Sequence, residues 1–549
     1  MCGRETAHTR LLEYQISNAM TITFPPPIYK RLFFRRVEAI NWHRAAAFTS
    51  RCLLCLACGL LASLPLKAQI WKGDINLSNQ AQVDTFDFAE VMGNVNISGS
   101  DITNLDGLSE LQSIGGVLSI YSNSSLTNVD GLSGLQSIGG GLYIYSNSSL
   151  TNVDGLSGIQ SVGGDLWISS NSSLTNVDGL SGLQSIGDYL LIGSNSSLTN
   201  VGGLSGVESI GGDMNIGFNG SLTNVDGLSG IQSIGGYVYI GSNNSLTNVD
   251  GLSGLQSLGE YLVIYNNSSL TNVDGLSGLK NIDGFLWVYF NNSLTNVDGL
   301  VGVQSIGGDM GIIENSSLTN VDGLSGVQSI GEGLHIVSNS SLTNVDGLSR
   351  VESIGGIIWI SSNSSLTNID GLSGVQSIGG YLSIDSNSNL TSVDGLSGVE
   401  SIGGGLQLSS NSNLSDCCIL TDLVEYAQGQ GYTVTISDNA INGSCNSVME
   451  IEDGCGACDL TITGITATGE SHPGENDGSI TITAMTSYGS LTYTIDGPAM
   501  MSNGTGVFTN LAPGNYAISV TDNGTTNCAA VGYSAKVGQP ISWLEEEGQ

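Results

Sequence analysis

The sequence predicts an all-β protein, in which a parallel β-solenoid of 24-residue coils is followed by a C-terminal β-sandwich of Ig-like type. A 24-residue unit recurs without insertion through residues 102–414, and seven of its positions are apolar in every copy. Residues 459–538 instead alternate apolar and polar side chains with period two. With 78 Gly but only 8 Pro in 549 residues, the composition suits a repeat protein and excludes collagen.

Residues 1–68 are predicted to be a signal region that is removed on export. Residues 52–66 form an apolar run of 15, preceded by Arg44 and Arg51. This is short for a membrane span and typical of the hydrophobic part of a signal peptide. Cleavage is expected after Ala68. No later segment could span a bilayer, so the mature protein is expected to be extracellular or on the cell surface.

Residues 69–101 are expected to be an N-terminal cap, a degenerate first coil that covers the open edge of the solenoid. We number the repeat from 1 to 24, with position 1 at Ile102 and then at every 24th residue to Leu414. Positions 1, 4, 7, 10, 13, 17 and 19 are always apolar. Gly at position 6, and usually at position 14, among Ser, Asn and Asp disfavours a helix. Short strands with glycine corners and seven inward columns are therefore predicted for residues 102–414.

Two polar columns also repeat. Asn occupies position 22 in all thirteen copies, from Asn123 to Asn411. We expect these side chains to hydrogen-bond along the stack, so the Asn-x-Ser/Thr matches are interpreted as ladder residues and not as glycosylation sites. Asp fills position 5 from Asp106 to Asp394, except at Gly202. The favoured interpretation is that each Asp caps its Asp-Gly corner, and the alternative is a row of Ca²⁺ sites.

Residues 415–457 break the repeat and are expected to form a disulfide-stapled cap, with a helix over 419–428. Six cysteines follow the signal region, an even number in an oxidising compartment. Three disulfides are expected, with Cys417 or Cys418 bonded to Cys445 and with Cys458 bonded to Cys528. A redox or zinc role for Cys455-Gly-Ala-Cys458 is the alternative, but no second CxxC motif or His cluster accompanies it. All six cysteines, including Cys455 and Cys458, are therefore predicted to form structural disulfides.

Residues 458–540 are predicted to be the β-sandwich, and residues 541–549 a short tail. The expected strands of the sandwich include LTITGITATG, GSITITAMT, LTYTIDG, GNYAISVTDN and AAVGYSAKV, and its turns are rich in Gly, Pro and Asn.

The charge balance excludes several classes of function. After residue 68 the chain has 4 basic and 46 acidic residues, so it would repel nucleic acids and anionic membranes. Only His335 and His472 remain there, and no Ser/His/Asp or HExxH pattern occurs. The sequence therefore predicts no enzyme, no catalytic residue, no metal site and no cofactor. A polysaccharide-acting enzyme with paired carboxylates is a remote alternative.

The candidate ligand-binding residues lie in the variable columns. Positions 16, 18 and 20 flank the inward positions 17 and 19 and should point outward from one strand. Aromatic side chains concentrate there, at Tyr121, Tyr143, Tyr145, Trp167, Tyr189, Tyr237, Tyr239, Tyr261, Tyr265, Phe285, Trp287, Tyr289, Trp359 and Tyr381. They could stack on sugar rings or anchor a protein partner, or they could reflect only the preference of strands for aromatic residues.

The repeat also resembles a known family. The run Leu142-Tyr-Ile144-Tyr-Ser-Asn147-Ser-Ser-Leu150-Thr-Asn-Val153-Asp-Gly-Leu156 is similar to the receptor L-domain, a relative of leucine-rich repeats. The resemblance covers about residues 70–457 and implies a right-handed β-helix used for ligand recognition. The unit has Asn-x-x-Leu where strict leucine-rich repeats have Asn-x-Leu, which argues against a helix-lined horseshoe.

A second resemblance concerns the sandwich. Residues 510–522 (NLAPGNYAISVTD) and 476–480 (NDGSI) resemble the SprB-type repeat of bacterial gliding adhesins, which implies a surface adhesin module. Two functions therefore compete: an adhesin that binds an extracellular glycan or surface protein through its aromatic face, and a structural stalk without a specific ligand. Ice binding is remote, because the Thr row at position 2 is single.

Overall fold

The computed structural model describes residues 69–441, 443–455, 460–486, 490–522 and 529–539. The expected signal region, the C-terminal tail and the expected Cys458–Cys528 bond lie outside these residues. Residues 70–455 form a stack of coils with long parallel sheets, and residues 460–539 form antiparallel sheets. The fold class predicted from the sequence is confirmed.

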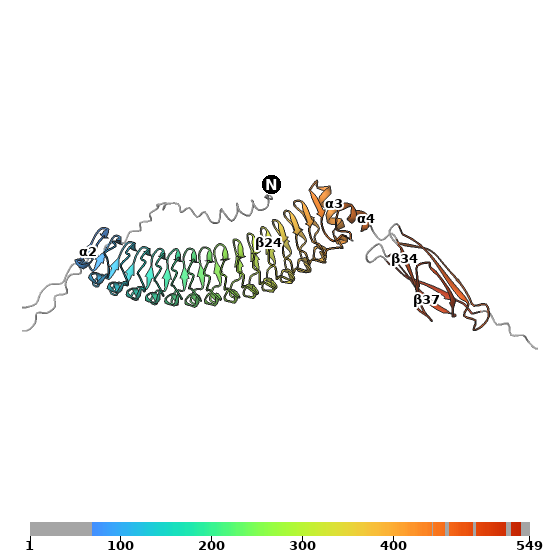
Figure 1. Cartoon of the computed structure of the whole chain (residues 1–549), viewed down its shortest axis with the longest axis horizontal. Helices are drawn as coiled ribbons and strands as arrows, with labels where there is room; N and C mark the ends of the chain where they lie inside the picture. The colour runs from blue at the N-terminus through green and yellow to red at the C-terminus, as the bar shows by residue number, and fades with distance from the viewer. Residues whose placement is uncertain (1–68, 442, 456–459, 487–489, 523–528, 540–549) are drawn as a thin grey trace, which may run out of the picture. The chain divides into compact units, whose positions relative to one another are not determined.

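Each coil contains a 3-10 turn, a short strand and a long strand, all recurring every 24 residues. The 3-10 turns run from η1 (Asp106–Leu108) to η13 (Asp394–Leu396). The odd-numbered short strands run from β5 (Ser113–Ile114) to β29 (Ser401–Ile402), and the even-numbered long strands from β6 (Leu118–Tyr121) to β30 (Leu406–Ser409). The coils lie side by side in one row, and equivalent residues pair in register (Figure 1).

The long strands make one sheet of 16 strands, which begins at β2 (Ile75–Leu77) and ends at β31 (Val434–Ser437). The short strands make a sheet of nine, from β1 (Ile70–Trp71) to β17 (Ser257–Leu258), and a sheet of six, from β19 (Asn281–Ile282) to β29. The division falls at the coil in which Asp283 replaces the glycine of position 14.

The core consists of the seven predicted inward columns. The most exposed of these side chains is Val399, at 8%, and most are fully buried. Glycine at position 6 lets successive coils approach: a Cβ on Gly251 would overlap the carbonyl oxygen of Val225 in the preceding coil. The apolar columns supply the driving force for stacking, and this glycine column sets how closely the coils stack.

The predicted asparagine ladder is confirmed. The backbone N–H and Nδ2 of Asn243 donate to Oδ1 of Asn267 at 3.0 and 3.3 Å, and Nδ2 also donates to the carbonyl of Ile216 at 2.9 Å. All thirteen ladder residues are 0% exposed. The residue before each Asn, at position 21, has a φ between 50° and 61°, a left-handed corner that brings the amide into the stack. These Asn side chains are structural.

The N-terminal region contains more than the single degenerate coil that was expected. Strands β1 and β2 with the helix α2 (Gln80–Asp84) form one short coil, and β3 (Glu90–Val91) with β4 (Val95–Ile97) begins a second. In the long-strand sheet Ile75 pairs with Val95, 20 residues later, and Val95 pairs with Leu118, 23 residues later. The irregular spacing hides these coils from a search for a 24-residue period.

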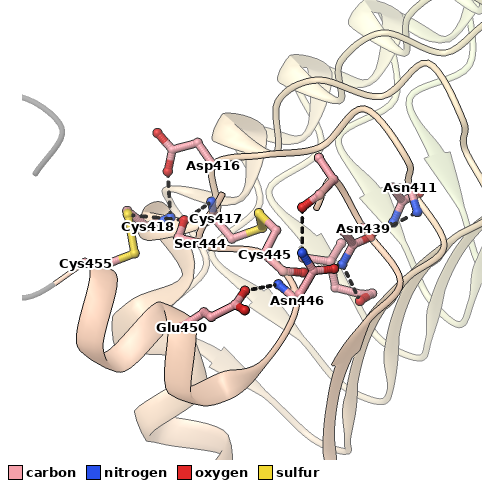
Figure 2. Close-up of a disulfide and its surroundings, with 12 residues drawn as sticks. Asn411, Asp416, Cys417, Cys418, Asn439, Ser444, Cys445, Asn446, Glu450 and Cys455 are labelled. Carbon is pink, nitrogen blue, oxygen red and sulfur yellow. Dashed lines mark hydrogen bonds between the residues drawn. A yellow bond between two sulfur atoms is a disulfide. The ribbon is translucent and has the colours of Figure 1, made fainter. Parts of the chain in front are cut away.

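The C-terminal cap is built from η14 (Cys418–Leu420), α3 (Thr421–Gly429), β31 and α4 (Val448–Gly454). Disulfides join Cys417 to Cys445 and Cys418 to Cys455, so the predicted bond to Cys445 is confirmed (Figure 2). Figure 2 also shows Asn439 accepting the last ladder bonds from Asn411. The helix predicted over 419–428 begins two residues later, after the 3-10 turn.

Two antiparallel sheets form the C-terminal part. One contains β32 (Thr461–Thr468), β33 (Gly478–Met485) and β36 (Val507–Leu511), and the other contains β34 (Leu491–Asp496), β35 (Met501–Asn503), β37 (Gly514–Asp522) and β38 (Ala529–Val537). Their inward residues share one core, in which the buried Tyr516 donates its hydroxyl to the carbonyl of Ala512 at 3.0 Å. Strands β35 and β36 were not foreseen. Across the described residues, no helix has both the length and the apolar character to cross a membrane.

Candidate binding face

We call the outward side chains at positions 16, 18 and 20 of the 16-stranded sheet the aromatic face. Along β8 (Leu142–Tyr145) and β20 (Leu286–Tyr289), fully buried core residues alternate with half-buried residues on the opposite side. In β18 (Leu262–Tyr265) the outward Val263 is buried as well, at 6%, whereas Tyr265 is half-buried. The assignment of positions 17 and 19 to the core and of positions 16, 18 and 20 to the outer side is therefore correct. The outward rings are nevertheless only partly exposed to solvent.

Rings in the same column stack on one another. The centroids of Tyr237 and Tyr261 lie 4.6 Å apart with planes 4° from parallel, and those of Tyr261 and Phe285 lie 4.2 Å apart at 10°. Parallel rings this close must lie face to face, because coplanar neighbours would overlap. Inside this stack the faces are used for packing and the ring edges remain for a ligand, whereas the Tyr237 hydroxyl is hydrogen-bonded to Tyr189.

Position 20 contains two further ring pairs. Tyr121 and Tyr145 stack at 5.0 Å and 6°, and Tyr265 and Tyr289 lie 4.5 Å apart at 32°. Phe290, at position 21, adds an edge contact to Tyr265, with centroids 6.0 Å apart. Sequence reasoning missed Phe290, because position 21 is usually Ser and does not belong to the outward strand columns.

Trp287 lies over a glycine of the next coil. A Cβ on Gly311 would meet the indole atom Cε3 at 2.6 Å, so the absence of a side chain there makes room for the ring. Beyond Gly311, the His335 ring lies 5.5 Å from the Trp287 ring, and Trp359 meets His335 edge-on at 6.2 Å. His335 Nε2 is 3.6 Å from Asp309 Oδ1. No role was expected for His335 from the sequence. In the structure its ring contacts both Trp287 and Trp359, and so connects Trp359 to the central rings.

Tyr239 and Tyr143 also lean over glycines. A Cβ on Gly241 would overlap the Tyr239 hydroxyl, and a Cβ on Gly141 would meet Cε2 of Tyr143 at 2.8 Å. The Tyr143 hydroxyl donates to Asp165 Oδ2 at 2.6 Å. Glycines in the variable columns thus leave the space that a neighbouring large ring occupies. This pairing of residues cannot be seen when each column of the repeat is considered alone.

The structure divides the predicted site residues into groups. An N-terminal group holds Tyr121, Tyr143, Tyr145 and Trp167, whose ring lies 6.1 Å from that of Tyr143. A central group holds Tyr189, Tyr237, Tyr239, Tyr261, Tyr265, Phe285, Trp287 and Tyr289, with Trp359 reached through His335. Tyr381 lies outside both groups and donates its hydroxyl to Gln407 Oε1 at 2.8 Å.

Burial raises the pKa of several phenols in the central group. It raises the pKa of Tyr289 to about 12, and the nearby Tyr265 adds to that shift. Burial is also the main cause that raises the pKa of Tyr239 and of Tyr261. Near neutral pH these hydroxyls are therefore neutral groups that can both donate and accept hydrogen bonds.

The aspartate column works differently from the favoured interpretation. Each Asp is the first residue of a 3-10 turn, but the capping side chain is the Asn two residues earlier: Asn128 Oδ1 accepts the Asp130 N–H at 3.1 Å. The Asp carboxylates remain exposed beside one another, and desolvation followed by Asp274 and Asp322 raises the pKa of Asp298. Among the described residues, no group of three or more His, Cys, Asp or Glu is arranged to hold a metal ion.

Comparison with protein families gives one match. The family model for the BspA type leucine-rich repeat region matches in six copies, over residues 94–217, 217–335 and 288–419. A search of curated proteins finds no significant match. The matched residues contain every coil of the aromatic face.

Proposed function

The chain belongs to the BspA-type leucine-rich-repeat family, and from this premise we propose that it is an exported bacterial adhesin or recognition protein that binds an extended glycan or a protein partner. Repeats of this type are typical of bacterial surface proteins and adhesins, a family that is generally not enzymatic. The two cap disulfides also suit an oxidising location outside the cytoplasm.

The observation that carries the proposal is the concentration of variation on one face. Columns 1, 4, 7, 10, 13, 17, 19 and 22 are nearly constant and buried, whereas positions 16, 18 and 20 change from coil to coil and carry the rings. A stack that needed only stability could repeat one residue in these columns as well. Varied, half-buried aromatic residues on a rigid sheet are typical of recognition surfaces.

The shape of the face supports an extended partner. Neighbouring coils present rings at centroid spacings of 4.2–5.0 Å within a column, and the same sheet continues over 16 strands. A polymer lying along the sheet could contact several coils at once, with ring edges and phenol hydroxyls meeting sugar C–H and O–H groups. A small ligand would need an enclosing pocket instead.

The ring stacks favour a second candidate, a structural stalk. Stacked pairs stabilise their own coils by about 0.5–1.5 kcal/mol each, whether or not a ligand binds. The resemblance of residues 458–540 to SprB-type adhesin repeats, and that of residues 70–457 to receptor L-domains, supports the adhesin instead.

A triple variant separates the two candidates. Tyr239→Ala/Tyr261→Ala/Trp287→Ala should weaken binding to a glycan-array ligand at least about 30-fold, since a buried aromatic anchor contributes about 2 kcal/mol or more. Because these rings are half-buried and stacked, we also expect a stability cost of about 1–3 kcal/mol, not the neutral effect of fully exposed residues. Binding is measured by titration, and stability by denaturant unfolding.

Tyr533→Ala, which removes an exposed ring from the sandwich, is the matched control and should bind like the wild type. If the folded triple variant binds as tightly as the wild type, the aromatic face is not the site and the stalk interpretation is preferred.

A further inference from the structure

The aromatic face is bordered by carboxylates. Positions 15 and 16 of the same coils hold Asp165, Asp188, Asp213, Glu260, Asp309 and Glu332. Desolvation, with smaller contributions from Glu260 and Asp188, raises the pKa of Asp213. Asp213, Asp188 and Glu260 therefore repel one another at the edge of the rings, and a positive ligand would relieve that repulsion.

No fixed positive charge balances them. The Lys and Arg residues among the described residues are Lys72, Lys280, Arg350 and Lys536. Lys280 precedes the short strand β19 and Arg350 follows η11 (Asp346–Leu348), so neither lies in the outward columns of the long strands. The titratable base of the face is His335, which already faces Asp309. A cationic partner would supply the charge that balances these carboxylates.

Two of the carboxylates flank the main ring stack. Asp213 occupies position 16 in the coil before Tyr237, and Asp309 occupies it in the coil after Phe285. In column 16 the next residue beyond each end of the Tyr237–Tyr261–Phe285 stack is thus a carboxylate, and at the Tyr237 end the side chain of Tyr189 also hydrogen-bonds to Tyr237. An ammonium group there could meet both a ring face and a carboxylate. The two carboxylates, Asp213 and Asp309, are four coils apart, about 19 Å at the usual strand spacing.

Both carboxylates are held in place. Asp213 Oδ1 accepts the backbone N–H of Tyr237 at 3.1 Å, and Asp309 Oδ1 accepts that of Gly333 at 2.7 Å. In each case the acceptor belongs to one coil and the donor to the next. These bonds fix where the negative charge lies.

We propose that the central part of the aromatic face binds a polysaccharide whose sugars carry free, protonated amino groups. The inference rests on the proposed function and specifies the charge of its ligand. A cationic peptide fits the charge equally well, but a peptide that bound by adding a strand would need an open sheet edge. Here the strands under the ring stack are paired on both sides, so the face offers no such edge. A glycan can bind the face of a sheet through contacts with aromatic rings and hydrogen bonds to side chains, without an open edge.

The test compares glucosamine oligomers with N-acetylglucosamine oligomers of equal length, using the full chain. We expect the free-amine oligomer to bind at least about tenfold more tightly at low ionic strength, and to lose this advantage in high salt. Asp213→Asn/Glu260→Gln/Asp309→Asn should abolish the preference while keeping the hydrogen-bond acceptors beside Tyr237 and Gly333. Equal or tighter binding of the acetylated oligomer, or no binding of the amine oligomer, would overturn the inference.

A matched variant excludes general attraction to an acidic protein. Asp226→Asn/Asp250→Asn/Asp274→Asn removes the same charge from the 3-10 corners of the three coils that carry the ring stack and should bind like the wild type. An equal loss in this variant contradicts a local site. Binding of oligolysine without binding of the amine oligomers would identify a basic protein partner instead, and overturn the proposal.

The aromatic triple variant separates this inference from the proposed function. If a neutral glycan binds the wild type at least as tightly as the amine oligomer does, and does not bind the triple variant, the proposed function stands and the inference is overturned. An amine oligomer that binds both equally would contradict both.

Discussion

Replacing Leu252 with Asp should unfold the middle of the solenoid. Leu252 ends η7 (Asp250–Leu252), is 0% exposed and packs between equivalent leucines of the neighbouring coils. A buried charge without a partner costs at least about 3 kcal/mol, and the local coils should open to relieve it. Hydrogen exchange followed by mass spectrometry should show fast exchange in the coils around residue 252, with the distant coils still protected, because repeat proteins are coupled mainly between neighbours.

Ser253→Asp is the control for this experiment. Ser253 is the next residue along the chain and is exposed, so its charged variant should exchange like the wild type. Unchanged protection in Leu252→Asp would contradict the assignment of position 7 to the core.

The second large effect is expected at Asn243. Alanine there removes the acceptor for the N–H and Nδ2 of Asn219, at 3.1 and 3.3 Å, and the donor to the Ile216 carbonyl. Each buried polar group left without a partner costs about 1–3 kcal/mol, so a total loss of about 3 kcal/mol or more is expected. Denaturant unfolding of the full chain, monitored by circular dichroism, measures it.

Asn244→Ala is matched in residue type and adjacent in sequence. Asn244 is exposed at the corner, so the change should leave the free energy of unfolding within about 0.5 kcal/mol of the wild type. Equal effects of the two alanine variants would show that the ladder contributes nothing beyond ordinary surface residues.

The architecture could be predicted from the sequence because constant columns carry it. A residue such as Leu252 recurs every 24 positions, so its burial follows from periodicity alone, and the same holds for the Asn243 column. The position of the cap disulfides was also accessible, since the cysteines begin where the repeat ends. The choice of Cys418–Cys455 required the structure, because adjacent cysteines at 417 and 418 are equivalent by spacing.

The details of the binding face could not be predicted, because they depend on contacts between unlike residues in different coils. Nothing in the sequence pairs Trp287 with Gly311, or places His335 beside both Asp309 and Trp287. The prediction that each Asp caps its own Asp-Gly corner was wrong for a related reason. Asn128 and Asp130 both recur with the repeat, and periodicity does not say which of the two side chains caps the turn.

The central claim is that the varied columns of the long-strand sheet are a binding surface, and hydroxyl-radical footprinting tests it most directly. The full chain is oxidised with and without the ligand selected on the glycan array, and the modification of each aromatic residue is measured. The account predicts protection of Tyr237, Tyr261 and Trp287, with Trp71 and Tyr533 unchanged. Protection confined to the sandwich or to the 3-10 corners, with these three rings oxidised as in the free protein, would contradict it.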